Sequence, residues 1–105
     1  MVIPYTLYPG PWPKKYTVYV PDRNNHLHTI HFGDQRYEDF TMHHDERRLN
    51  NYLIRHQHDQ FYNPYKPSFW STYVLWNPFK IADIHESFLY AASLAQLLNE
   101  RGQFL

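Results

Sequence analysis

The sequence predicts an α+β fold with an N-terminal extended arm, a β-hairpin, one amphipathic helix, an aromatic-rich connector and a C-terminal helix. Three observations lead to this prediction. Two alternating runs of β-branched and aromatic residues flank a turn segment, two later segments repeat apolar residues at helical spacing, and proline is concentrated near the N-terminus. At 105 residues the chain has the length of one domain with a modest core. We divide it into an arm (1–14), a small α+β domain (15–79) and a C-terminal helix (80–105).

Composition and charge restrict the classes of function. Ten basic residues balance ten acidic ones, so no field from the whole chain attracts nucleic acid or membrane. Cysteine is absent, which excludes disulfides and thiolate metal sites. No apolar run approaches the roughly 20 residues of a membrane span, and the N-terminus lacks the apolar core of a signal peptide. We expect a soluble protein of a reducing compartment. Tyr and Trp, which are abundant here, are typical of protein interfaces as well as of cores.

The arm combines four prolines with several large apolar side chains. Proline at this density excludes a helix or a central strand, so the arm should be extended. Tyr5, Tyr8 and Trp12 are among more large apolar groups than a solvated tail would carry. Two alternatives therefore stay open: the arm lies over its own domain, or it docks on another chain.

The hairpin is predicted by "KYTVYV" at 15–20 and "HLHTIHF" at 26–32, which flank the turn-forming "PDRNN". Because side chains alternate along a strand, Val18 and Val20 share one face, and Ile30 and Phe32 share one face of the second strand. The dipeptide that follows, Gly-Asp, should end that strand sharply.

A helix is predicted from about Asp45 to His58. His44 and Asp45 supply a plausible N-cap, and Glu46 suits the positive end of the helix dipole. One stripe of this helix consists of Leu49, Tyr52, Leu53 and His56. The adjoining face carries Arg47, Arg48, Asn51, Arg55 and His58.

Two aromatic or apolar segments complete the chain. The middle of the connector at 61–79, "FWSTYVLW", could be a short strand or a helical turn, and we favour the turn. The last segment, "ADIHESFLYAASLAQLLNERG", has a capping box at Asp83 and Glu86 and a helix stop at Gly102. Its apolar stripe consists of Ile84, Phe88, Ala91, Leu94, Ala95 and Leu98. On its other side lie Leu89, Tyr90 and Leu97, an excess of apolar surface that indicates a partner.

Metal binding and nuclease activity are the two most specific functions that the histidines could indicate, and we favour neither. No tight pair such as H-E-x-x-H is present, so we predict no metal site and no cofactor. His26 and His28 could chelate, but they flank a solvated turn. A ββα-metal nuclease would have to use Asn50, Asn51 and His56, and the Asp-His dipeptide of its first strand is missing. We therefore predict no catalytic residues and no enzyme.

Phosphate or nucleic-acid binding is the next alternative. Arg47, Arg48 and Arg55 beside Tyr52 could hold a backbone through bidentate bonds and stacking, with Lys14 and Lys15 in support. Acidic residues are close in sequence, however. We expect these arginines to be neutralised within the fold, with Asp34 and Asp39 pairing with Arg48 and Arg55 to fix the hairpin against the helix.

The run "KKYTVYV…HTIHFGDQRYEDFTMHHDERRLNNYLIRH…FWSTYVLWN" resembles a family of small, poorly characterised proteins of large double-stranded DNA viruses of eukaryotes and of some phages. The resemblance spans roughly residues 14–77. It is carried by Phe32, Gly33, Asp34, Tyr37, Asp39, His43, Glu46, Arg47, Arg48, Tyr52, Arg55, His56, Trp70 and Trp76. The family usually has a lysine and a proline between the histidine and E-R-R, and "HHDERR" lacks the proline.

The resemblance implies a viral origin and a minor structural component of the virion, and it implies no catalytic residues. The sequence thus favours a non-enzymatic minor capsid or virion-assembly protein that bridges or cements larger coat subunits. It would be made in the host cytoplasm and reside in the virion, with other viral structural proteins as partners and no membrane span. The expected partner-binding residues are Tyr5, Tyr8, Trp12, Leu89, Tyr90 and Leu97, while Trp70 and Trp76 close the core. The alternative is a nucleic-acid-binding protein, and the third possibility is the metal-dependent nuclease.

Overall fold

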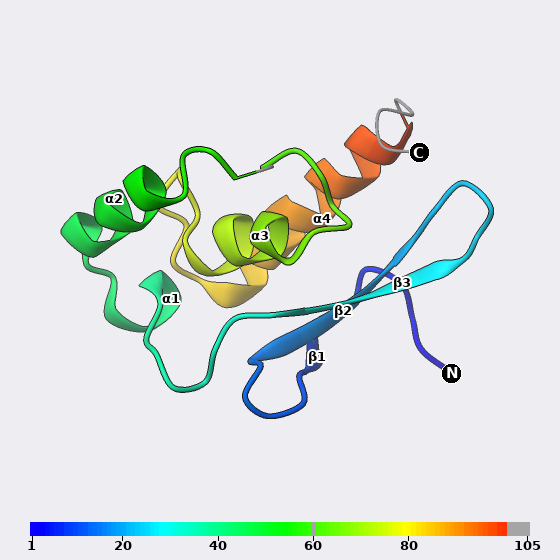
Figure 1. Cartoon of the computed structure of the whole chain (residues 1–105), viewed down its shortest axis with the longest axis horizontal. Coiled ribbons are helices and arrows are strands. Elements are labelled where there is room, and N and C mark those ends of the chain that lie inside the picture. The colour runs from blue at the N-terminus through cyan, green and yellow to red at the C-terminus, as the bar shows by residue number, and fades with distance from the viewer. Residues whose placement is uncertain (60, 101–105) are drawn as a thin grey trace.

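The structure, a computed structural model, describes residues 1–59 and 61–100 and confirms the α+β class (Figure 1). An antiparallel sheet of order β1-β2-β3 is formed by Tyr8–Pro9, Tyr16–Pro21 and Leu27–Phe32. The helices are α1 (Phe40–His43), α2 (Glu46–Arg55), α3 (Pro67–Trp70), the π-helix η1 (Ser71–Leu75) and α4 (Ile84–Glu100). In Figure 1, α3 and α4 lie on one side of the sheet, and α1 and α2 lie together beyond the end opposite the hairpin turn.

The predicted hairpin and its faces are confirmed. Tyr16 pairs with Phe32 and Val18 with Ile30, so the inward residues of both strands fall in register. The turn is held by the Asp22 side chain, which accepts hydrogen bonds from two backbone N–H groups of the turn. This Asx-type geometry explains why "PDRNN" reverses the chain.

The arm lies along the edge of its own sheet and extends it by one short strand. Of the two alternatives that the sequence left open, this is the one in which the arm docks on its own domain. Tyr8 pairs with Thr17 in the short strand β1, and the Tyr5 amide donates to the Tyr19 carbonyl at 3.1 Å. The rings of Tyr8 and Tyr19 meet edge to face at 5.7 Å. A proline at the end of β1 is tolerated because β1 is an edge strand. Tyr5 and Tyr8 are thereby half-buried, whereas Trp12 is 71% exposed.

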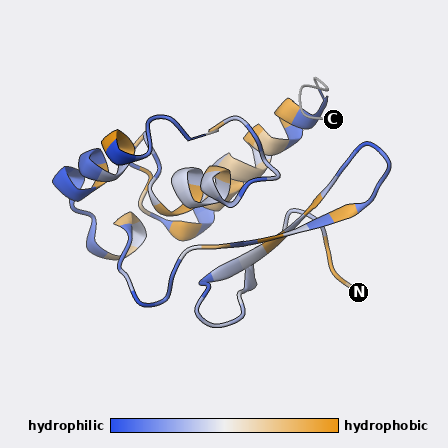
Figure 2. Cartoon of the chain, in the orientation of Figure 1, coloured by the Kyte–Doolittle hydropathy of each residue, from blue (hydrophilic) through white to orange (hydrophobic). Residues whose placement is uncertain are grey.

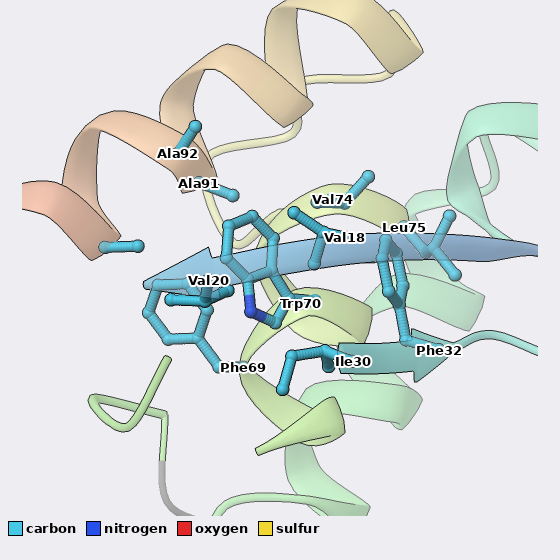
Figure 3. Close-up of a cluster of buried hydrophobic side chains, with 11 residues drawn as sticks. Val18, Val20, Ile30, Phe32, Phe69, Trp70, Val74, Leu75, Ala91 and Ala92 are labelled. Atoms are coloured by element: carbon cyan, nitrogen blue, oxygen red, sulfur yellow. The ribbon is translucent and has the colours of Figure 1, made fainter. Parts of the chain in front are cut away.

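One core joins the sheet to α3, η1 and α4 (Figure 3). Trp70 is fully buried at its centre, and its Nε1 donates to the Pro64 carbonyl at 2.8 Å. Burying a large apolar side chain contributes roughly 1.5–3 kcal/mol, so this ring and its neighbours dominate stability. The cluster consists of Val18, Val20, Ile30, Phe32, Phe69, Trp70, Val74, Leu75, Ala91, Ala92 and Ala95. The alanines let the backbone of α4 approach closely, as the sequence indicated, and α4 shares the core of residues 15–79.

The second helix begins where the sequence predicted and ends earlier. The Asp45 side chain caps α2 by accepting from the amides of Arg47 and Arg48, whereas His44 adopts a positive φ and ends the preceding helix. The predicted end at His58 is wrong. Beyond Arg55 the chain turns, because the Asp59 amide donates to the His56 carbonyl and the two side chains hydrogen-bond at 2.8 Å.

The short helix α1 was not predicted, because four residues carry no periodicity. Asp39 caps it by accepting from the amide of Thr41. The connector is helical, as favoured: α3 begins at Pro67 and continues directly into η1. In α4, the Asp83 side chain accepts from the amides of His85 and Glu86, while the predicted stop at Gly102 lies outside the described residues. No helix within residues 1–59 and 61–100 has the length and hydropathy to cross a membrane.

Candidate functional site

One polar groove of the described chain lies where the base of the hairpin meets α2 and η1. It encloses about 360 Å³. We call it the hairpin groove, and it is lined by Lys14, Lys15, Gly33, Asp34, Tyr37, Glu38, Asp39, Tyr52, Arg55, His56, Ser71, Leu75 and Trp76. Most of the residues that carry the family resemblance of the sequence therefore come together in one place.

An aromatic stack forms part of the groove wall. The ring of Tyr52 lies parallel to Trp76, with centroids 4.6 Å apart and an interplanar angle of 4°, and His56 stacks on Tyr52 at 4.2 Å. The Tyr52 hydroxyl lies 3.4 Å from the Thr72 hydroxyl, and burial raises the pKa of Tyr52. Tyr52 is almost fully buried, whereas the Trp76 and His56 rings that stack on it are half-buried.

Gly33 allows the hairpin to end against the connector. Its φ is +78°, which residues with a side chain rarely adopt. A Cβ atom at this position would come within 2.9 Å of Leu75 Cδ1 and 3.0 Å of Lys15 Cβ. Both the backbone angle and the lack of space therefore require glycine at position 33 of the Gly-Asp turn.

The predicted ion pairs of Asp34 and Asp39 with Arg48 and Arg55 are wrong. Asp34 binds Arg36, through bonds of 2.8 and 3.0 Å to the guanidinium and a further bond to its amide. The Arg36 guanidinium, followed by its backbone N–H, lowers the pKa of Asp34 to about 2. Arg36 lies two residues from Asp34 in the chain, so this ion pair forms without any tertiary contact. A pair with an arginine of α2 would need the helix to be placed beside the turn.

Asp39 pairs instead with Lys15 at the start of β2, and both side chains are nearly buried. Asp39 also accepts from the amide and hydroxyl of Thr41, so one carboxylate caps α1 and ties it to the sheet. The sequence indicated an internal partner for Asp39 but not this one. Lys15 had been assigned only a supporting role in phosphate binding.

The arginine face of α2 is only partly neutralised. Arg48 binds Glu38 at 3.1 Å, and both side chains are about half exposed. Among the described residues, Arg47 and Arg55 form no ion pair, and the Lys14 ammonium forms none either. Lys14 lies close enough to Asp34 to contribute to its lowered pKa, after the larger effects of Arg36.

His28, His31 and His56 have ordinary structural partners. His28 lies 3.0 Å from Asp22 and is the main cause of that carboxyl's lowered pKa, and His31 bonds the Thr17 hydroxyl at 2.7 Å. No group of three or more potential ligands that could hold a metal occurs in residues 1–59 or 61–100. Of the residues considered for a nuclease, His56 bonds Asp59, and Asn50 and Asn51 are exposed on α2.

His43 was noted only as part of the family pattern, and it has an unusual environment. Its Nδ1 accepts from the Asp45 amide at 2.9 Å, next to the cap of α2. Its Nε2 is buried without a hydrogen-bond partner in the described structure, and the ring lies 5.3 Å from that of Trp76. Burial, followed by the charge of Arg48, lowers the pKa of His43.

A second candidate surface is the outer face of α4. Leu89 is 67% exposed and Leu97 46% exposed, as expected for a side of the helix that faces away from the core. Tyr90 is half-buried, with its ring 5.6 Å from that of Phe79, which is itself 67% exposed. A shallow hollow here is lined by Ile81, Glu86, Leu89, Tyr90 and Ser93. Figure 2 shows that α4 is markedly less hydrophilic than α2.

The fold and these two surfaces define a class of protein: a small α+β domain with one mixed-charge aromatic groove and one exposed apolar helix face. Comparison with known proteins adds a single finding. Residues 10–56, less than half of the chain, match the model of a family of unknown function (DUF5754). Within the hairpin groove, only Ser71, Leu75 and Trp76 lie outside that match. No curated protein and no solved structure matches the chain.

Proposed function

We propose that this chain is a non-enzymatic assembly component that binds larger protein subunits through the outer face of α4. The observation that supports this most directly is the exposure of Phe79, Leu89 and Leu97 around Tyr90. A helix that met only water would carry polar residues at these positions. Clustered apolar and aromatic side chains on a surface are typical of protein-binding sites.

The nature of the partner comes from the family resemblance described in the sequence. It supports a minor capsid or virion-assembly protein, made in the host cytoplasm and carried in the particle, that bridges or cements coat subunits. Trp12, held at 71% exposure by an arm that is itself docked on the sheet, offers a second aromatic anchor. Tyr5 and Tyr8, which the sequence predicts to reach the partner, are half-buried and contact Tyr19 of the chain's own sheet.

Co-sedimentation with mature particles, followed by a high-salt wash, tests this proposal. An interface made by apolar and aromatic side chains is insensitive to screening, so the chain should stay with the particles. Recovery of the chain in the soluble fraction at every salt concentration would contradict the proposal.

Nucleic-acid binding is the second candidate, because Arg47 and Arg55 are exposed and unpaired among the described residues. Phosphate contacts release counterions, so this binding must weaken steeply as salt rises. Salt-labile association that persists with purified viral DNA and fails with empty shells would favour it over the assembly role.

A further inference from the structure

The charges of the hairpin groove do not cancel once each ion pair is assigned. Lys15 is neutralised by Asp39, Asp34 by Arg36 and Glu38 by Arg48. Two cations of the groove wall remain, Lys14 and Arg55, neither of which forms an ion pair with a described residue. Both side chains are exposed, so both are available to a ligand.

The same groove has an apolar part beside these cations. Trp76 is half-buried, with its ring stacked on Tyr52, whereas Leu75 in the same wall is almost fully buried. Tyr37, on the segment that follows β3, is 69% exposed and lines the groove as well. An occupant therefore needs an anionic group for the two cations and an apolar or aromatic group for this wall.

We infer that the hairpin groove binds a short extended segment of a partner protein that carries a carboxylate side chain next to an aromatic or large apolar one. The carboxylate would lie between Lys14 and Arg55, and an arginine can bind it through two parallel hydrogen bonds. The neighbouring side chain would contact Trp76 and Tyr37. This inference rests on the proposed function, because it describes a second contact that the same protein partner would make.

A peptide fits these observations better than a nucleic acid does. Proteins that bind a phosphate backbone without sequence preference neutralise several phosphates, and the groove offers two free cations. Asp34 and Glu38 also lie on its wall, where a strand carrying one charge per nucleotide would meet them. A peptide with a single carboxylate needs no more than Lys14 and Arg55.

The test is an NMR titration of the ¹⁵N-labelled full chain with the peptide acetyl-Glu-Trp-amide, which carries a single carboxylate. The indole N–H of Trp76 and the amide of Gly33 report on the groove. The indole N–H of Trp70, fully buried and bonded to Pro64, is an internal reference that should not move. We expect saturable shifts at the first two signals only. The isosteric peptide acetyl-Gln-Trp-amide should bind about tenfold more weakly, since it lacks the charge-assisted hydrogen bonds.

Two double variants distinguish the contribution of Lys14 and Arg55 from the effect of removing positive charge elsewhere on the chain. The double variant Lys14→Gln/Arg55→Gln should weaken binding of the acidic peptide about tenfold, an effect of the size expected for lost charged hydrogen bonds. The matched control, Arg23→Gln/Arg47→Gln, removes two exposed cations that do not line the groove, and it should bind as the wild type does. All four positions are exposed, so neither variant should unfold the chain.

Three results would overturn the inference. The first is the absence of shifts at about 5 mM peptide, where even a millimolar site is filled. The second is equal binding of the glutamine peptide. The third is that hexathymidylate moves the same signals at lower concentration, which would make the groove a nucleic-acid site. Failure of the proposed function can be distinguished from failure of this inference. The proposed function is tested by binding to particles, with variants of α4 that leave the groove intact.

Discussion

Gly33 is the residue at which the hairpin, the connector and the groove meet. Replacing it with alanine should destabilise the fold by about 2–4 kcal/mol, because a positive φ and a close contact with Leu75 both oppose a Cβ atom. Urea denaturation measures this loss. Asn50→Ala, an exposed substitution in α2, is the control and should change stability by less than about 0.5 kcal/mol. A similar small effect at Gly33 would contradict this account of the turn.

Asp39 combines two roles that can be separated by mutation. Asp39→Asn can still cap α1, but it leaves the nearly buried Lys15 ammonium without its counter-charge. We expect a loss of about 3 kcal/mol in the free energy of unfolding. The double variant Lys15→Met/Asp39→Asn should recover a large part of this loss. If the single variant is as stable as the wild type, the pair does not hold the sheet to α1.

His43 should make stability depend on pH below its ordinary pKa of 6.5. Burial lowers its folded-state pKa, so below pH 6.5 the unfolded chain binds more protons at this residue. The contribution is complete above that pH and falls as the pH drops towards the folded-state value. Protonation of Nδ1 would also break the bond from the Asp45 amide. The charged groups near the ring are Glu38, Asp39, Asp45 and Arg48.

The comparison that isolates this effect uses His43→Asn. The Asn oxygen can accept from the Asp45 amide but does not titrate. Melting temperatures measured at about pH 7.5 and about pH 5.5, on either side of the ordinary histidine pKa, should fall less in the variant than in the wild type. Equal slopes would show that His43 is not the titrating group.

Among the elements, α4 depends most on small residues. Ala95 is fully buried where α4 meets the core, so Ala95→Leu should overpack the contact and cost about 1–3 kcal/mol. Gln96→Leu, one residue along and exposed, introduces the same side chain where it meets solvent and should be nearly neutral. Thermal unfolding of the two variants gives the comparison. Equal melting temperatures would mean that α4 does not approach the core closely.

Elements with a repeating pattern were predictable from the sequence, and elements fixed by a single contact were not. Alternation identified the inward faces of β2 and β3, and capping residues located the starts of α2 and α4. The turn of α1 has too few residues for a period. The early end of α2 depends on one contact, between His56 and Asp59.

In the candidate site, too, the sequence indicates which residues matter, and the contacts between them depend on the fold. The sequence grouped Gly33, Asp34, Asp39, Arg48 and Arg55 as turn and ion-pair residues, and all of these except Arg48 line the hairpin groove. The partner of Asp39 could not be predicted, because only the finished fold brings Lys15 near it, whereas Arg36 lies two residues from Asp34 in the sequence. Lys15 reaches Asp39 only after the sheet and α1 are in place.

For the whole molecule, we propose that the α4 face and the hairpin groove contribute differently to binding of a partner. In the proposed assembly role, the apolar face of α4 would supply contact area, whereas the hairpin groove would place charged groups at defined positions. Apolar burial supplies most of the affinity of an interface, and charge complementarity supplies most of its specificity. The chain as a whole has no net charge, which suits a component that sits between protein subunits.

The most direct test of the central claim is co-sedimentation of the double variant Leu89→Asp/Leu97→Asp with mature particles. Both leucines are exposed, so the variant should fold as the wild type does, and circular dichroism can verify this. The matched control, Asn50→Asp/Asn51→Asp, adds the same two charges to the exposed face of α2. We predict that the wild type and the control remain with the particles after a high-salt wash and that the α4 variant is lost. Retention of the folded α4 variant at wild-type level would contradict the claim that this face binds the partner.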